Sequence, residues 1–134
     1  MKRFAFLPLL LIAAAAPAAN APGPDTPASL MAGYAAEAGA APSAERGAAF
    51  FAATQAGGKP DTPSCSTCHT ANPRAEGRTR AGKAIEPMAA SVSPTRYTDF
   101  KFVEKWFGRN CDSVLGRACT PGEKADFIAY MASL

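Results

Sequence analysis

The sequence has few of the residues that commonly do chemistry, since its 134 residues include one histidine, one tryptophan and four cysteines. It has neither a G-x-x-x-x-G-K-[ST] loop nor a G-x-G-x-x-G motif, which excludes the usual nucleotide-binding sites. No apolar run is long enough to span a membrane, which excludes a multi-span transporter. β-Branched residues are also scarce and alanine is abundant, so the composition favours helices.

The charge is small once an N-terminal signal is set aside. The formal net charge is +3, from fourteen basic and eleven acidic residues. Removing Lys2 and Arg3 with the signal leaves twelve basic residues against the same eleven acidic ones. A charge this close to neutrality gives no support for a nucleic-acid partner. The length allows one small domain.

The N-terminus predicts an export signal. Lys2 and Arg3 precede an apolar run over residues 4–16, and small residues of the A-x-A form end at Ala18 and again at Ala21. We place the cleavage after one of these two alanines. An uncleaved anchor is the alternative, although the run is short for a membrane span. Export predicts a periplasmic protein without a membrane span after cleavage, in an oxidising compartment.

Four short helices and one long loop are predicted. The helices cover residues 29–38, residues 43–54 with Ser43 as N-cap, residues 100–110 with Thr98 or Asp99 as cap, and a last segment that opens with a capping box at Thr120. Residues 60–98 are rich in Pro, Gly, Ser and Thr and show no period, which predicts an ordered loop. So long a loop in a small domain is unusual, and it fits a chain that wraps something other than protein.

Cys65, Cys68 and His69 form a C-x-x-C-H motif that contains the only histidine. Two thiols at this spacing can form thioether bonds with the two vinyl groups of one haem, and the adjacent histidine is placed to be the proximal iron ligand. The motif therefore predicts one covalent haem c. The macrocycle would also supply the apolar core that the long loop lacks.

Two other interpretations use the cysteines differently. With Cys111 and Cys119, the first pair could form a four-cysteine zinc site, although an oxidising compartment would tend to consume those thiols. A thioredoxin-like redox pair would need a βαβ context, which the pattern does not show. The second pair favours a Cys111–Cys119 disulfide, which would close a loop of nine residues and contribute about 2–3 kcal/mol. Residues 112–118 predict a surface turn.

Two residues compete for the sixth position of the iron. Met88 follows a proline 19 residues after His69, and a thioether opposite histidine is typical of electron transfer. Asn110 falls in the same helical stripe as Trp106 and Phe107, where its amide needs a partner. Asn110 could instead cap the C-terminus of its helix, which the pattern alone slightly favours.

The chain resembles the class I cytochromes c and, from residue 43 to its last residue, the SHP (sphaeroides haem protein) family of exported c-type cytochromes. The resemblance rests on the haem motif and on residues 68–73, 85–89, 103–107, 109–111, 115–120 and 123–126. It implies a small all-α class I cytochrome c fold, with three to five short helices and long loops around one covalent haem. The implied organisation is a signal peptide over residues 1–21, an N-terminal extension over residues 22–42 and a monohaem cytochrome c domain over residues 43–134.

In that family an asparagine, not a methionine, is the sixth ligand of the oxidised haem. The corresponding residue here is Asn110, and the disulfide is Cys111–Cys119. The resemblance implies a high-spin haem that loses the asparagine on reduction and opens to oxygen or another small diatomic ligand, with a diheme cytochrome c as redox partner. We therefore expect a monomeric, redox-active, ligand-binding cytochrome. The alternative is an electron shuttle with His69 and Met88 as ligands, and no further acid–base residue indicates an enzyme.

Overall fold

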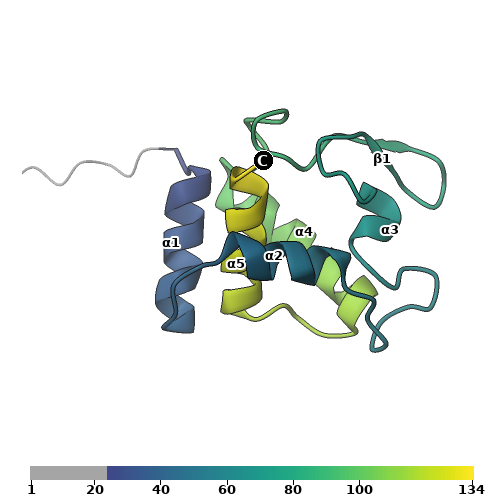
Figure 1. Cartoon of the computed structure of the whole chain (residues 1–134), viewed down its shortest axis with the longest axis horizontal. Coiled ribbons are helices and arrows are strands. Elements are labelled where there is room, and N and C mark those ends of the chain that lie inside the picture. Colours follow the sequence, from purple (N-terminus) through teal and green to yellow (C-terminus); the bar gives the residue numbers. More distant parts are fainter. Residues whose placement is uncertain (1–23) are drawn as a thin grey trace, which may run out of the picture.

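The computed structural model describes residues 24–134, so the predicted export signal and its cleavage positions lie outside the described residues. Along this part of the chain the order is α1 (Pro27–Ala38), α2 (Ala44–Ala52), α3 (Ser66–His69), β1 (Gly77–Arg78), β2 (Ala84–Ile85), α4 (Phe100–Leu115) and α5 (Pro121–Ala132) (Figure 1). The two strands form one antiparallel hairpin, with Gly77 opposite Ile85. This arrangement confirms the predicted all-α class. None of the helices within residues 24–134 has the length and apolar character needed to cross a membrane.

The four long helices begin at side-chain caps. Ser43 accepts a hydrogen bond from the backbone N–H of Arg46, and Thr120 forms the predicted capping box with Glu123. Of the two candidate caps before α4, Asp99 is the one used. Thr26 caps α1 in the same way, which starts that helix at Pro27 rather than at the predicted residue 29.

The end of α4 corrects two predictions. The helix continues five residues past Asn110 to Leu115, where Gly116 adopts a left-handed conformation with φ of 69°. The predicted end at Asn110, its role as a cap and the surface turn over residues 112–118 are therefore wrong. Val114 and Leu115 are buried, and their burial continues the helix across residues of low helix propensity.

The predicted loop over residues 60–98 contains α3 and the hairpin. Helix α3 has four residues and each strand has two, which is too few to produce a periodic pattern in the sequence. The rest of this stretch is irregular, as predicted.

The core lies where α5 packs against α1 and α2 (Figure 1). Phe51, Ile128 and Met131 are its most deeply buried large side chains. The ring of Phe127 lies 5.5 Å from that of Phe107 and 6.2 Å from that of Phe51, so it joins α4 and α2 through α5.

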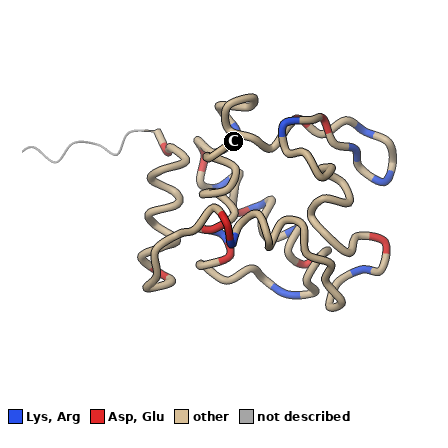
Figure 2. The backbone as a smooth tube through the Cα atoms, in the orientation of Figure 1, with Lys and Arg blue, Asp and Glu red and all other residues tan. Residues whose placement is uncertain are grey.

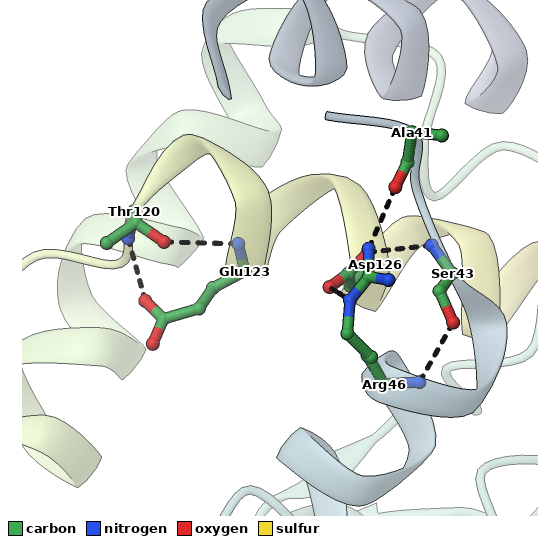
Figure 3. A network of polar contacts seen from close by, with 6 residues as sticks. All are labelled: Ala41, Ser43, Arg46, Thr120, Glu123 and Asp126. Carbon is green, nitrogen blue, oxygen red and sulfur yellow. Dashed lines mark hydrogen bonds and ion pairs between the residues drawn. The ribbon is translucent and has the colours of Figure 1, made fainter. Parts of the chain in front are cut away.

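The contact between α2 and α5 combines a close backbone approach with a polar network. A Cβ added to Gly47 would lie 2.8 Å from Cβ of Tyr130, so only glycine fits at the crossing. Figure 3 shows Asp126 accepting hydrogen bonds from the backbone N–H of Ser43 at 2.7 Å and from Nε of Arg46 at 2.7 Å. Asp126 is buried, and these partners compensate for its lost hydration.

The segment predicted as an N-terminal extension contains α1, which packs on α5. Leu30 and Tyr34 are its buried residues. The Tyr34 hydroxyl donates to Glu104 at 2.5 Å, and Nζ of Lys124 donates to the same carboxylate at 2.7 Å. Burial, with the neighbouring Glu104, raises the pKa of Tyr34 above its ordinary value.

Candidate functional site

A largely apolar cavity of about 460 Å³ lies between α4 and the irregular segment that joins α2 to α4. Figure 1 shows α3 and the hairpin at one end of the molecule and α1 at the other, and no residue of α1 lines the cavity. Both the haem motif and the two candidate sixth ligands line it: Cys65, Cys68, His69, Met88 and Asn110. The fold therefore brings together the five residues that the sequence singled out.

One turn of helix presents the C-x-x-C-H motif to the cavity. The backbone N–H of His69 donates to the carbonyl of Cys65 at 3.1 Å, which closes the turn. Neither Cys65 nor Cys68 is in a disulfide. Burial raises the pKa of the Cys65 thiol to about 11, with a smaller opposing effect of a backbone hydrogen bond, so this thiol stays neutral.

The imidazole of His69 is suited to bind a metal ion. Burial, together with the smaller effect of the positive charge of Arg96, lowers the pKa of His69 to about 4. A neutral imidazole is the form that coordinates metals. Its Nδ1 is buried and has no hydrogen-bond partner among the described residues.

The backbone around the motif is tightly constrained. Thr70 has a φ of 61° and is the one non-glycine residue with positive φ in residues 24–134. Its hydroxyl donates to the carbonyl of Asn72 at 2.9 Å and holds this strained turn. A Cβ on Gly77 would lie 3.0 Å from Cα of His69, so the hairpin can approach α3 only with glycine at this position. Sequence reasoning missed Gly77, because an isolated glycine in a loop gives no distinctive pattern.

Met88 is held in the cavity wall by its backbone. Its N–H donates to the carbonyl of Pro73 at 2.8 Å, and its own carbonyl accepts from the Tyr97 hydroxyl at 2.8 Å. Arg96 donates to the two preceding carbonyls, of Pro87 and Glu86, at 3.0 and 2.7 Å. The adjacent residues Arg96 and Tyr97 thus brace the Met88 segment, a role that their sequence positions did not signal.

Asn110 lines the cavity from the interior of α4, two turns after Phe102. Its side chain is exposed, so the expectation of a buried amide that needs a partner is wrong, and it makes no hydrogen bond with the described residues. The next residue, Cys111, is joined to Cys119 by a disulfide, which ties this part of α4 to the start of α5. The structure therefore places Met88 and Asn110 at the same cavity.

The alternative metal site is not present. Because Cys111 and Cys119 form a disulfide, they cannot complete a four-cysteine zinc site with Cys65 and Cys68. Within residues 24–134 no group of three or more His, Cys, Asp or Glu side chains is arranged to hold a metal ion. The one hairpin of the described chain is antiparallel, so the βαβ context of a thioredoxin-like pair is also missing there.

The residues around the cavity fit a haem. Phe102 and Trp106 line it, and their side chains are 44% and 40% exposed. A planar macrocycle bound in the cavity would cover this exposed apolar surface. Arg80, Lys83 and Arg96 also line the cavity and can pair with haem carboxylates. Figure 2 shows the basic residues along the hairpin that borders the cavity. Two free thiols, a neutral imidazole and an apolar cavity with a basic edge define a c-type cytochrome.

The comparisons with known proteins agree. Residues 37–131 match a family model described as "Domain of unknown function (DUF1924)". The chain is 60% identical over 111 residues to cytochrome c-type protein SHP of Cereibacter sphaeroides. The alignment covers 83% of this chain and 86% of that protein. The chain is 46% identical over 68 residues to cytochrome c'' of Methylophilus methylotrophus, covering 50% and 47% of the two chains.

Solved structures give the same assignment. The structure described as oxidised SHP, an oxygen-binding cytochrome c, has a TM-score of 0.81 at 60% identity and covers 84% of this chain and 100% of that one. Oxidised cytochrome c'' of M. methylotrophus has a TM-score of 0.66 at 35% identity, with 80% and 93% covered. The chain belongs to the DUF1924 family and, within the c-type cytochromes, to the SHP family, whose members carry covalent haem c.

Proposed function

We propose that this chain is an exported, periplasmic cytochrome in which Asn110 is a labile sixth ligand of the haem. The observation that carries the proposal is the position of the Asn110 amide, which lines the same cavity as Cys65, Cys68 and His69. The haem supplies an iron that exchanges one electron and has a sixth position for a ligand. Cys65 and Cys68 would hold it covalently, and His69 would be the proximal ligand.

Asn110 has neither a capping role nor a core role in α4. It lies five residues before the end of α4, so it does not cap the helix. Asparagine is a poor residue for a helix interior, because its side chain competes for backbone hydrogen bonds. Packing does explain Met88, which is 7% exposed and belongs to the hydrophobic core. Asn110 is exposed and lines the cavity, so its amide is free to bind the haem iron, whereas packing already accounts for Met88.

The chemistry of an amide makes this ligand labile. An amide oxygen is a hard donor, which prefers ferric iron to the softer ferrous iron. Asn110 would then bind the oxidised form and leave the reduced form, opening the sixth position to oxygen or another diatomic ligand. The disulfide at Cys111 holds the backbone of Asn110 close by, so the amide can return on oxidation.

The descriptions of two relatives are consistent with a haem whose sixth position can open. The solved SHP structure is described as an oxygen-binding cytochrome c. A solution structure of cytochrome c'', with a TM-score of 0.68 and 35% identity, covers 81% of this chain and 93% of that one and is described as giving insight into haem-ligand detachment. By the same resemblance, the chain would act as a monomer and exchange electrons with another cytochrome, a diheme cytochrome c.

The second candidate is an electron shuttle with His69 and Met88 as ligands. It is favoured by the Met88 side chain in the cavity wall and by the hydrogen bonds that brace its backbone. A thioether stays on the iron in both redox states, so this protein would transfer electrons without an open site.

Visible and near-infrared spectra of Met88→Leu and Asn110→Ala separate the two candidates. We expect a high-spin ferric spectrum without a sulfur band, unchanged in Met88→Leu and altered in Asn110→Ala. The reduced protein should bind carbon monoxide quickly, because no strong ligand must first dissociate. A sulfur band that disappears in Met88→Leu, with no change in Asn110→Ala, would establish the electron shuttle instead.

A further inference from the structure

We infer that Trp106, supported by Phe102, limits the size of the ligand that can replace Asn110, so that the site selects small ligands over bulky ones. This inference rests on the proposed lability of Asn110. It concerns which molecules can use the sixth position, not whether that position opens.

The three residues follow one another along a single face of α4. Phe102, Trp106 and Asn110 are spaced by four residues, and each lines the cavity. Side chains four apart on a helix are neighbours, with Cβ atoms about 5–6 Å apart. A molecule that takes the place of the Asn110 amide therefore lies beside the Trp106 indole.

Contacts on several sides hold the indole in place. Its centroid lies 6.1 Å from that of Phe102 in an edge-on arrangement with an interplanar angle of 66°. Nζ of Lys105 lies 5.9 Å from the indole centroid and Cζ of Arg109 lies 5.6 Å from it, both in cation–π geometry. These contacts restrict the movement of the indole, so a larger ligand would have to break them to displace the ring.

The test compares ligands of increasing bulk on the reduced, haem-loaded protein. Dissociation constants of carbon monoxide, methyl isocyanide and tert-butyl isocyanide are measured by absorbance titration in the wild type and in Trp106→Ala. We expect the wild type to bind tert-butyl isocyanide at least about tenfold more weakly than methyl isocyanide. Trp106→Ala should reduce this ratio by about tenfold and leave carbon monoxide affinity nearly unchanged, and Trp106→Phe should give an intermediate ratio.

Phe100→Ala is the matched control, because Phe100 is 47% exposed on the same helix and does not line the cavity. Its ratio should equal that of the wild type. If Trp106→Ala fails to retain haem, Phe102→Ala is tested in the same way and should also lower the ratio. A ratio that stays at the wild-type value in every cavity variant that retains haem would overturn the size limit. Carbon monoxide that binds only after Met88→Leu would instead disprove the lability of Asn110, and the inference with it.

Discussion

At the scale of single residues, His69 is distinguished by a buried nitrogen that the described residues leave without a hydrogen-bond partner. Buried polar groups in proteins are almost always hydrogen-bonded, so each exception needs an explanation. Nδ1 of His69 is the one buried side-chain nitrogen or oxygen without a partner in residues 24–134. Asn110 is exposed, so it is not an exception of this kind, whereas the buried Asp126 is hydrogen-bonded to Ser43 and Arg46. The unpartnered nitrogen therefore distinguishes His69 from the structural polar residues.

Glu123 provides a pH-dependent prediction at this scale. The hydrogen-bonded ion pair with Arg117, at 2.7 Å, lowers the pKa of Glu123, and burial opposes this effect. The hydrogen bond from the backbone N–H of Thr120, shown in Figure 3, lowers this pKa further. A lowered carboxyl pKa stabilises the fold above the unfolded-state pKa, and this contribution is lost as the pH falls through the folded-state pKa. Glu123→Gln keeps the cap and removes the charge, so it should cost about 0.3–1 kcal/mol at neutral pH.

Urea unfolding of the wild type and Glu123→Gln at several pH values measures this contribution. The difference between the two free energies of unfolding should shrink as the pH is lowered below the ordinary range of a glutamate. A difference that stays constant with pH would show that the charge contributes nothing. Glu45→Gln, a charge removal in the first turn of α2 with no ion pair recorded for it, is the control.

At the scale of elements, the starts of α2, α4 and α5 were predictable from their caps, whereas the end of α4 was not. Ser43 and Thr120 have capping side chains that act within four residues, so the sequence carries that information locally. The end of α4 depends instead on the burial of Val114 and Leu115, which long-range packing determines. The bracing of Met88 by Arg96 and Tyr97 is missed for the same reason, because residues about nine positions apart in an irregular segment give no periodic signal.

Replacing two helical glycines by alanine should change the free energy of unfolding in opposite directions. Gly47→Ala places a methyl group against the backbone of α5 at Asp126 and 2.8 Å from Cβ of Tyr130, so α2 and α5 must separate. We expect a loss of about 3 kcal/mol in the free energy of unfolding, at the upper end for overpacking. Gly33→Ala lies on α1, where the new methyl group meets nothing within 4 Å, and should stabilise by about 0.5–1 kcal/mol.

Thermal or denaturant unfolding of the two haem-loaded variants tests this contrast. Because both changes raise helix propensity equally, only the packing differs between them. Equal stabilities of Gly47→Ala and Gly33→Ala would contradict the close approach of α2 to α5.

At the scale of the whole molecule, the helical core and the cavity depend on different parts of the sequence. The packing of α5 on α1 and α2 uses ordinary apolar side chains, and periodicity predicts it in outline. The irregular segment around the cavity has no periodicity, and its site was predictable only because C-x-x-C-H is specific to covalent haem. The motif identified the site, whereas the residues that shape its walls, such as Gly77, required the structure.

The four cysteines should be fully consumed in the native protein. Cys111 and Cys119 form the disulfide, and the two thioether bonds to haem would use Cys65 and Cys68. Mass spectrometry of unreduced, alkylated protein should therefore find no free thiol. Cys111→Ser with Cys119→Ser should lower the free energy of unfolding by about 2–3 kcal/mol, the value for a short loop. Two alkylatable thiols in the native protein would contradict this allocation.

The allocation also predicts which cysteines hold the cofactor. A thioether bond survives acid–acetone extraction, whereas a haem held by iron coordination alone is released. Cys65→Ala with Cys68→Ala should therefore release its haem on extraction, and either single variant should retain it through the remaining bond. The Cys111→Ser, Cys119→Ser variant also lacks two cysteines but keeps both motif thiols, so it should retain haem as the wild type does. Covalent haem in the Cys65→Ala, Cys68→Ala variant would show that the cavity thiols are not the attachment points.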